Sequence, residues 1–365
     1  MGEAYRVCIA GQRRGGVARG LPECSSLPGV ELRVGRRGDS LVELTDLRWE
    51  DSSMIIRADV EDAARRTAGL VRRTPVVTAG PDLVPPGTVF KLEFLQHTGS
   101  FKARGALNRI RSAKEQGHLD PSVGVVVASG GNAGLANAYA AAHLGVPATV
   151  FVPQGAPPVK VERLRAYGAT VVTRGSEYAE AYEAAVEYAS TTGAVYCHAY
   201  DQPEIVAGAG TLGLELRDQT DGALDTVLVA VGGGGLMAGV AAALEGDARV
   251  VAVEPAAAPT LHAALAAGTP VDVGVAGVAA DSLGARRVGA IAYDVAVRTG
   301  VRSVLVAEDD IIAARRRLWR DWRIVIEHGA AVALAALTSG AYVPEPGDRV
   351  AVVLCGANTD PRDLP

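Results

Sequence analysis

A lysine stands where an expected strand gives way to an expected helix. Residues 88–94 (TVFKLEF) have the composition of a short strand. Residues 101–117 (FKARGALNRIRSAKEQG) have apolar residues at helical spacing, with Lys102 near their start. The positive end of a helix dipole and partial burial both disfavour an ammonium group, so they lower the pKa of a lysine. The neutral amine that results can form imines and act as a general base. An isolated lysine at such a place is most often a solvated surface residue, so this interpretation depends on the neighbouring motifs.

Two glycine-rich turns add places where an anion can bind. Residues 129–132 (SGGN) and residues 232–235 (GGGG) each connect a valine-rich expected strand to an expected helix. Backbone N–H groups at the start of a helix bind phosphate and carboxylate groups. The first turn also fits a purely structural interpretation, in which Asn132 caps its helix. The second turn favours phosphate binding, because four successive glycines cost ordering entropy, and it lacks the GxGxxG pattern of dinucleotide folds.

A fourth cluster lies near the C-terminus, where Cys355 follows the valine-rich run 349–354 (RVAVVL). Taken alone, this cysteine is most simply a small residue of the core. All four clusters, however, fall at junctions between expected strands and the segments that follow them. Because open α/β sheets bind ligands at the carboxyl ends of their strands, we expect the four clusters to converge.

The elements that must position these clusters alternate between strands and helices from Met54 onward. Continuous valine-rich strands separated by helices predict an α/β protein with open parallel sheets that helices cover on both faces. Three strand–helix units fall between about 122 and 200. We therefore expect a large domain made of residues 54–118 and 203–365, with a small α/β domain, residues 119–202, inserted into it.

The bulk composition excludes several classes of protein. The 365 residues carry a formal net charge of −5, which gives no electrostatic footprint for nucleic acid or for an anionic membrane. No apolar run approaches the ~20 residues of a membrane span. The four cysteines are widely spaced and include no CxxC pair, so we expect reduced thiols in a cytoplasmic protein.

The first 53 residues differ from the rest of the chain. They are rich in Arg and Gly and show little apolar periodicity, so we expect an N-terminal extension over residues 1–53. The segment lacks the apolar core of a secretory signal, and it contains too many acids for a transit peptide. Two interpretations stay open, a mobile extension or translation that starts at Met54. A hairpin over residues 29–49 is a further expectation.

Together the four clusters resemble fold-type II enzymes that use pyridoxal 5'-phosphate (PLP) and have the tryptophan synthase β-like fold, specifically the serine/threonine dehydratase and serine racemase family. The resemblance covers about residues 54–360, and its most specific motif is the segment 100–106 (SFKARGA). It implies that Lys102 holds PLP as a Schiff base and is the catalytic residue. It also implies that Phe101 packs on the pyridine ring.

The resemblance assigns the other clusters as well. It implies that Asn132 contacts the 3'-oxygen of the cofactor and that Cys355 is a neutral partner for the pyridine nitrogen, which suits elimination better than transamination. It implies a phosphate cradle at Gly232, Gly233, Gly234 and Gly235. It implies a substrate-binding loop at Ser129, Gly130, Gly131, Asn132 and Ala133.

The departures from the family pattern are informative. Racemases of this family carry a serine at the place of Gly130, which acts as acid and base opposite the lysine, so racemisation is disfavoured. The family usually has His where Ala133 stands, and the smaller residue widens the substrate pocket. Some members bind a structural mono- or divalent cation. Glu254 matches the first ligand and Ala258 offers a carbonyl, but Thr260 replaces the acid, which counts against the ion.

The implied function is that of a lyase, a threonine/serine ammonia-lyase of amino acid metabolism. The enzyme would convert a small-molecule amino acid substrate with a β-hydroxyl group, such as L-threonine or L-serine, to a 2-oxo acid and ammonia. The family also implies a homodimer. PLP-dependent β-replacement stays open, but Ala103 counts against cysteine and threonine synthases, which typically have Asp there. Three further functions stay open: a biosynthetic dehydratase on an unusual amino acid, a PLP-binding sensor without turnover and a nucleotide-binding α/β protein.

Overall fold

Ten strands form two sheets in residues 54–80 and 82–364, the part of the chain that the computed structural model describes. The larger sheet has the order β1-β2-β10-β7-β8-β9, and the smaller sheet has the order β5-β4-β3-β6. β1 and β2 pair antiparallel, and the other neighbours are parallel. The predicted α/β class is confirmed. The strands are β1 (Val76–Thr78), β2 (Val89–Lys91), β3 (Val125–Ala128), β4 (Ala148–Val152), β5 (Thr170–Thr173), β6 (Val195–Tyr196), β7 (Thr226–Ala230), β8 (Arg249–Pro255), β9 (Arg302–Val306) and β10 (Val350–Val353).

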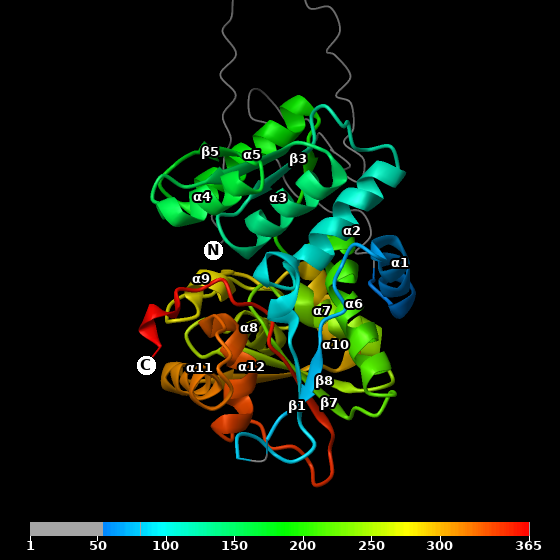
Figure 1. Cartoon of the computed structure of the whole chain (residues 1–365), viewed down its shortest axis with the longest axis vertical. Coiled ribbons are helices and arrows are strands. Elements are labelled where there is room, and N and C mark those ends of the chain that lie inside the picture. The colour runs from blue at the N-terminus through cyan, green and yellow to red at the C-terminus, as the bar shows by residue number, and fades with distance from the viewer. Residues whose placement is uncertain (1–53, 81, 365) are drawn as a thin grey trace, which may run out of the picture. The chain divides into compact units, whose positions relative to one another are not determined.

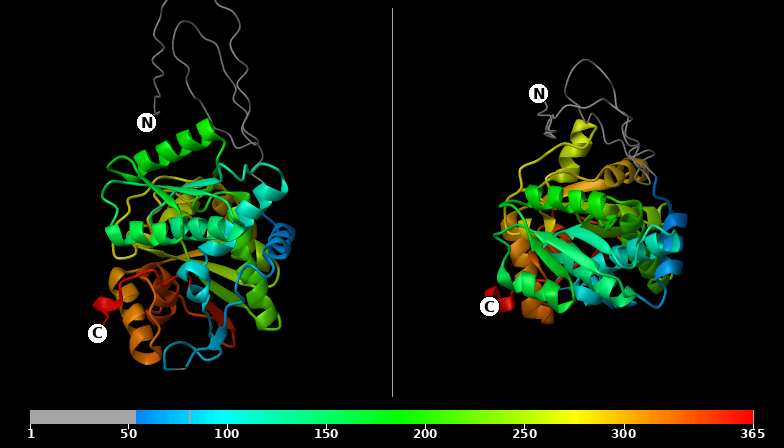
Figure 2. Two further views of the ribbon diagram at one scale, coloured as in Figure 1. Left: turned by 45° about the horizontal axis from the view of Figure 1, so that its top comes forward. Right: turned by 90° about the horizontal axis from the view of Figure 1, so that it is seen from above.

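Helices pack on both faces of each sheet (Figures 1 and 2). The helices are α1 (Arg57–Thr67), α2 (Lys102–Glu115), α3 (Asn132–Leu144), α4 (Pro158–Ala166), α5 (Tyr178–Thr192), α6 (Pro203–Gln219), α7 (Gly235–Leu244), α8 (Thr260–Ala267), α9 (Ala280–Leu283), α10 (Ala290–Thr299), α11 (Glu308–Trp322) and α12 (His328–Thr338). In the larger sheet α6, α7 and α10 lie on one side, and α11 and α12 lie on the other. In the smaller sheet α5 lies opposite α3 and α4. Helix α2 packs against α3, which covers the smaller sheet, and against α6, which covers the larger sheet, and so connects the two parts of the fold.

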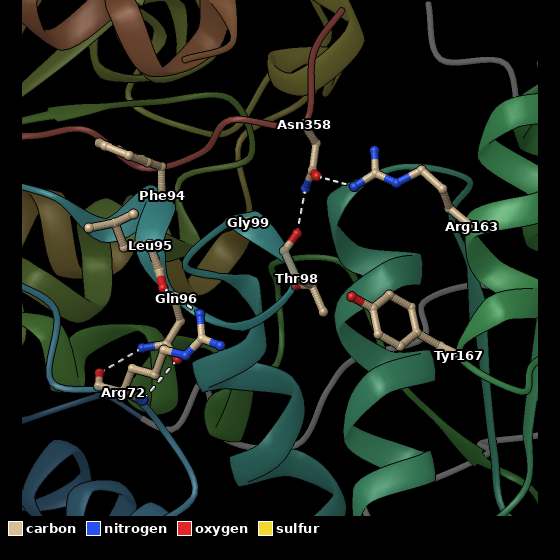
Figure 3. Close-up of a pocket in the computed structure, with 9 residues that line it drawn as sticks. All are labelled: Arg72, Phe94, Leu95, Gln96, Thr98, Gly99, Arg163, Tyr167 and Asn358. Atoms are coloured by element: carbon tan, nitrogen blue, oxygen red, sulfur yellow. Dashed lines mark hydrogen bonds between the residues drawn. The ribbon is translucent and has the colours of Figure 1, made fainter. Parts of the chain in front are cut away.

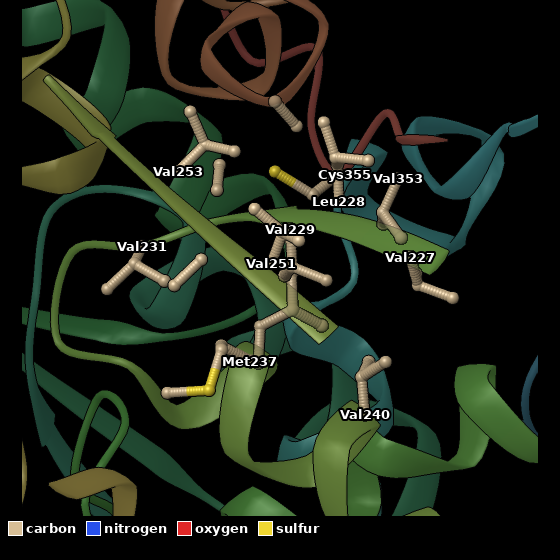
Figure 4. Packing of buried hydrophobic residues seen from close by; sticks show 14 of the residues in the cluster. Val227, Leu228, Val229, Val231, Met237, Val240, Val251, Val253, Val353 and Cys355 are labelled. Carbon is tan, nitrogen blue, oxygen red and sulfur yellow. The ribbon is translucent and has the colours of Figure 1, made fainter. Parts of the chain in front are cut away.

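The valine-rich strands make the core of the larger sheet. Val227, Leu228 and Val229 of β7 are completely buried, because α7 packs on one face of the sheet and α12 on the other. Figure 4 shows Met237 and Val240 of α7 against the valines of β7 and β8. A continuous apolar strand, without alternation, is what burial on both faces requires.

Strand β2 is shorter than the expected strand over 88–94. It ends at Lys91, and Glu93 begins a short 3-10 helix, η1 (Glu93–Leu95). The turn places the Glu93 carboxylate in the interior, where it accepts hydrogen bonds from Arg104 Nε (2.5 Å) and from Thr74 Oγ1 (2.7 Å). Backbone hydrogen bonds still join this turn to its neighbours, because Leu92 N–H donates to Pro75 (3.0 Å) and Phe94 N–H donates to Leu354 (2.9 Å).

The smaller sheet is built entirely from residues 125–196, while strands that precede and follow this segment build the larger sheet. Residues 53–365 cluster as one compact unit, so the domain boundaries expected at 118/119 and 202/203 stay predictions. The extension expected over 1–53, with its hairpin over 29–49, lies outside the described residues. None of the helices that the structure describes is both long enough and apolar enough to cross a membrane.

Candidate functional site

The clusters singled out in the sequence lie on loops at the carboxyl ends of strands, as expected for an open α/β sheet. Because β10 pairs with both β2 and β7, the loop after β10 lies between the loops that follow those two strands. The N–H of Phe101 donates to the carbonyl oxygen of Cys355 (3.0 Å), and Ser100 forms an isolated bridge with Gly356. This pairing joins the lysine motif to the cysteine loop across more than half of the chain.

Lys102 is the first residue of α2, and its amino group has one hydrogen-bond acceptor. Nζ donates to the carbonyl oxygen of Ala199 (2.6 Å) and lies 4.8 Å from the centre of the Phe101 ring. Burial lowers the pKa of the Lys102 ammonium to about 8, although Cys355 and Glu327 act in the opposite direction. Roughly a tenth of the amine is then neutral at pH 7, against less than about a thousandth for an ordinary lysine. The side chain can therefore act as a nucleophile and as a base.

A short loop after β6 presents the carbonyl group that faces Lys102. His198 Nδ1 accepts hydrogen bonds from the N–H groups of Tyr200 (3.2 Å) and Asp201 (2.9 Å). Burial and, to a smaller extent, the nearby Lys102 charge lower the pKa of the His198 imidazole to about 4, so the ring is neutral. The acceptor nitrogen holds the turn that directs the Ala199 carbonyl oxygen toward Lys102.

The glycine loop 232–235 collects backbone donors at one point. Among the described residues, the N–H groups of 232–237 donate no hydrogen bond to any protein acceptor. Gly234 has φ +87°, in the left-handed region that favours glycine. A Cβ at Gly233 would collide with the ring of Tyr200. The backbone conformation and the packing both require glycine here, and free N–H groups at the start of a helix are the kind of donors that can bind an anion.

Thr260 ties this cradle to a buried carboxylate. Thr260 Oγ1 lies 2.5 Å from the carbonyl oxygen of Gly232 and 3.2 Å from Glu254 Oε1. The Glu254 carboxylate also accepts the N–H groups of Leu261 (2.7 Å) and His262 (2.8 Å), in the first turn of α8. Glu254 thereby anchors α8 and, through Thr260, one end of the glycine loop.

At the place of the expected cation, Glu254 and Ala258 already have hydrogen-bond donors. The carbonyl oxygen of Ala258 accepts the N–H of Thr260 (3.2 Å), and donors surround the Glu254 carboxylate where a cation would need further acceptors. Residues 54–80 and 82–364 contain no group of three or more His, Cys, Asp or Glu side chains that could hold a metal ion.

Asn132 begins α3 and is held between an acid and an amide. Its Nδ2 donates to both carboxylate oxygens of Glu327 (2.8 and 3.2 Å), and its Oδ1 accepts from Asn358 Nδ2 (2.6 Å). The N-cap position belongs to Gly131, and no side chain caps the helix. The interpretation of Asn132 as a helix cap is therefore wrong, because its amide is engaged by residues outside its own helix.

The rest of the 129–133 loop has small side chains. Ser129 Oγ accepts the N–H of Gly131 (3.3 Å), and Ala133 is buried in the first turn of α3. A Cβ at Gly130 would meet Val152 Cγ1 at 3.4 Å, an ordinary van der Waals contact. Packing therefore does not demand glycine at position 130.

Cys355 is buried beyond the end of β10, next to the lysine motif. Burial raises the pKa of the Cys355 thiol well above its usual range, and the Glu327 carboxylate adds to that effect. The thiol is therefore protonated at neutral pH and can act only as a weak hydrogen-bond donor or acceptor.

Asn358, which contacts Asn132, also lines a hollow (Figure 3). Asn358 Nδ2 donates both to Asn132 Oδ1 and to the carbonyl oxygen of Thr98 (2.8 Å), and Asn358 Oδ1 accepts from Arg163. The lining residues are Arg72, Phe94, Leu95, Gln96, Thr98, Gly99, Arg163, Tyr167 and Asn358.

Sequence reasoning missed Glu327, Asn358 and His198. Burial raises the pKa of the Glu327 carboxyl to about 7, and its side chain contacts Asn132 from the start of α12. One acid within the apolar run 324–337 (IVIEHGAAVALAAL) was a signal that could have drawn attention to it. Asn358 follows Cys355 closely, but nothing in the local sequence indicates its partner.

The comparison with protein families gives one model that spans most of the chain. The model described as "Pyridoxal-phosphate dependent enzyme" matches residues 67–356. That range includes Lys102, the two glycine-rich turns and Cys355.

Individual proteins agree with this match. The chain is 37% identical over 310 residues to L-threonine ammonia-lyase of Geobacter sulfurreducens, which covers 84% of this chain and 76% of that protein. It is 39% identical over 295 residues to phenylserine dehydratase of Ralstonia pickettii, covering 80% of this chain and 89% of that protein. The structure of maize serine racemase superposes with a TM-score of 0.79 at 29% identity, covering 84% of this chain and 94% of that one.

Proposed function

The chain belongs to the family of pyridoxal-phosphate-dependent enzymes, and we propose that it is a dehydratase, or ammonia-lyase, of β-hydroxy amino acids of the threonine or serine type. The products are a 2-oxo acid and ammonia. One observation carries this proposal: Lys102, whose pKa is lowered, lines the same cavity as Gly235. Gly235 begins α7, whose first N–H groups have no acceptor among the described residues.

The residues present fit PLP. We assign the phosphate to the N–H groups of 232–237, which have no acceptor among the described residues. We assign the aldehyde carbon to Lys102 Nζ, the face of the pyridine ring to Phe101 and the pyridine nitrogen to Cys355, whose thiol stays protonated. When bound, PLP supplies the electron sink for the negative charge that develops at the substrate Cα.

The residues of the chain then hold the substrate and move its protons. The N–H groups of the 129–132 loop, at the start of α3, bind the substrate carboxylate, apart from that of Gly131, which Ser129 Oγ accepts. Lys102 Nζ takes the Cα proton as general base, and its low pKa makes the neutral form available near pH 7. The Ala199 carbonyl oxygen keeps Nζ in place between the two halves of the site.

The side chain of the substrate is the finer part of the proposal. Two relatives of similar identity are named for substrates whose side chains differ in size, threonine and phenylserine. Gly130 and Ala133 keep the loop 129–133 free of large side chains. One methyl group changes binding by only ~1–3 kcal/mol, so we expect turnover of several hydroxy amino acids with graded kcat/KM.

The test is to purify the protein with PLP, record the visible absorbance of the bound cofactor, and add L-threonine, L-serine or phenylserine. Equal yields of 2-oxo acid and ammonia are expected, and L-alanine, which lacks the hydroxyl group, is the matched control. Bound cofactor without product from any of them would contradict the dehydratase and favour β-replacement or a sensor. A protein that binds no PLP would contradict the whole assignment.

Racemisation is the second candidate, because maize serine racemase has a similar structure. It needs an acid and base on the face opposite Lys102, and Gly130 offers no side chain there. We therefore expect no D-serine in the L-serine reaction, measured by chiral chromatography.

Three finer expectations accompany the proposal. We propose a homodimer, to be tested by the mass from light scattering, and a cytoplasmic location. The cation at Glu254 and Ala258 stays a separate expectation, tested by metal analysis of the purified protein.

A further inference from the structure

Glu327 occupies the N-cap position of α12, but its side chain makes no hydrogen bond to that helix. Only 8% of the residue is exposed, and both carboxylate oxygens lie within 3.2 Å of Asn132 Nδ2, on α3. A side chain at an N-cap usually stabilises its helix by accepting a backbone N–H. Because Glu327 does not do so, the stability of α12 does not explain why an acid is buried here.

The contacts on its two sides, with Glu327 and with Asn358, determine which way the Asn132 amide points. Oδ1 of Asn132 faces Asn358 Nδ2, and the same nitrogen of Asn358 faces the carbonyl oxygen of Thr98. Arg163 can only donate to Asn358 Oδ1 and the Thr98 carbonyl oxygen can only accept, so Nδ2 of Asn358 is the donor toward Asn132. At the other side of Asn132, the ionised Glu327 carboxylate accepts from Nδ2. Asn132 therefore has a single orientation, with Nδ2 toward Glu327 and Oδ1 toward Asn358.

The surrounding backbone makes room for this carboxylate. A Cβ at Gly356 would collide with Glu327 Oε1, and the N–H of Glu327 donates to the carbonyl oxygen of Gly356 (3.1 Å). The charged and titratable groups around the carboxyl are Lys102 on α2, Asp281 on α9 and Cys355 beyond β10. Lys102 is the one cation among these three groups.

We propose that Glu327 is a positioning residue, which holds the Asn132 amide so that Asn132 presents an N–H donor to the 3'-oxygen of the cofactor. The inference rests on the proposed function, because it concerns the same site. It predicts that Glu327 acts through Asn132 on the electronic state of bound PLP and on the rate of turnover, but not on the folding of the chain.

The experiment compares Glu327→Ala and Glu327→Gln with the wild-type holoenzyme. Ala removes the acceptor, so we expect kcat to fall about a hundredfold, with a smaller change in KM. The pH midpoint of the visible absorbance of bound PLP should shift as well. Gln keeps a carbonyl acceptor, so it should stay within about tenfold of the wild type. Neither variant should lower the melting temperature of the apoprotein, because burial disfavours the charged carboxylate.

A matched control is Glu308→Gln, which changes another acid at a helix start, one that accepts the N–H of Val278 (2.6 Å) outside the site. It should keep the wild-type spectrum and kcat. If Glu327→Ala fails to fold, Asn358→Ala gives an independent test, because it removes the donor on the other side of Asn132. Asn358→Ala should shift the pH midpoint of the visible absorbance of bound PLP in the same direction as Glu327→Ala does.

The outcomes separate the two proposals. A wild-type protein without bound PLP or without turnover contradicts the proposed function itself. An active wild type with an Ala variant of unchanged spectrum and kcat overturns the positioning role. A Glu327→Ala variant that loses activity and melts at a lower temperature, while the spectrum of its bound PLP is unchanged, would also overturn the positioning role. That combination is expected of a purely structural residue.

Discussion

Two lysines near β2 show how differently the molecule treats a buried amine. Lys91, at the end of β2, is completely buried, and its Nζ donates to a backbone carbonyl oxygen (2.9 Å), to the Glu215 carboxylate (2.8 Å) and to a glutamine side chain (2.8 Å). Lys102 donates to a single backbone carbonyl oxygen, that of Ala199. Burial lowers the pKa of both ammonium groups, but in Lys91 the bond to Glu215 opposes it directly.

The surroundings of Lys91 form a complete ionic cluster. Arg104 donates to Glu93 (2.5 Å) and to Glu215 (2.7 Å). The cluster therefore holds two cations, Lys91 and Arg104, and two acids. Buried charges are tolerated when each is paired and hydrogen-bonded. Lys102 has no ion pair among the described residues, and a perturbed, poorly paired group in a cavity marks a functional site. The comparison teaches that burial alone does not make a lysine reactive, whereas burial without a counterion does.

The sharpest way to break this comparison is to replace Lys102 by Met, which keeps the length of the side chain. We expect kcat for L-threonine to fall by at least about a thousandfold, because the general base and cofactor attachment are lost together. The melting temperature of the apoprotein should stay the same or rise, measured by calorimetry. A Lys102→Met protein that kept its turnover would remove Lys102 from the mechanism.

The same substitution at Lys91 should give the opposite result. Lys91→Met leaves the Glu215 carboxylate with one cationic partner and removes three hydrogen bonds, which we expect to cost about 3 kcal/mol of unfolding free energy. The measurement is urea denaturation at 25 °C. Turnover per folded molecule should remain near that of the wild type, and a catalytic loss without destabilisation would contradict the structural role.

The smallest effect concerns the pH at which the apoprotein takes up PLP. The pKa of Lys102 is about 8. As the pH rises toward that value, the neutral fraction of the amine increases about tenfold per pH unit, and above it the fraction levels off. The rate of appearance of the visible absorbance, followed after mixing apoprotein with PLP, should follow the same curve. A rate that keeps rising to about pH 10 would mean that Lys102 titrates as an ordinary lysine.

Much of the fold could be predicted from the sequence, because strand and helix periodicities are local. The valine-rich strands 226–230 and 350–353 and the helix that starts at Lys102 lie where their patterns indicate. The expected strand over 88–94 was too long, because Glu93 turns inward to meet Arg104. Nothing in the local sequence of either segment predicts that these two side chains pair.

The residues of the site also divide into those that local sequence indicates and those that it does not. Lys102, the 232–235 loop and Cys355 could be proposed as site residues from the sequence, because each belongs to a contiguous motif at a strand end. Their roles stay predictions. Glu327 could not be proposed in this way, because its partner Asn132 is distant in sequence and the acid itself lies in an apolar run. The donors around the Glu254 carboxylate come from α8 and from β9, so its hydrogen bonds could not be predicted from its own segment either.

The α/β class, the lysine at the start of a helix and the glycine loop follow from local sequence, because periodicity and backbone freedom are properties of short segments. Only the tertiary structure decided that β10 lies between β2 and β7, which brings the Cys355 loop to the lysine motif. It also decided that Lys91 is neutralised by Glu215 while Lys102 is not. Strand order, burial and ion pairing depend on which distant segments meet, and the free energy of a buried charge depends on those neighbours.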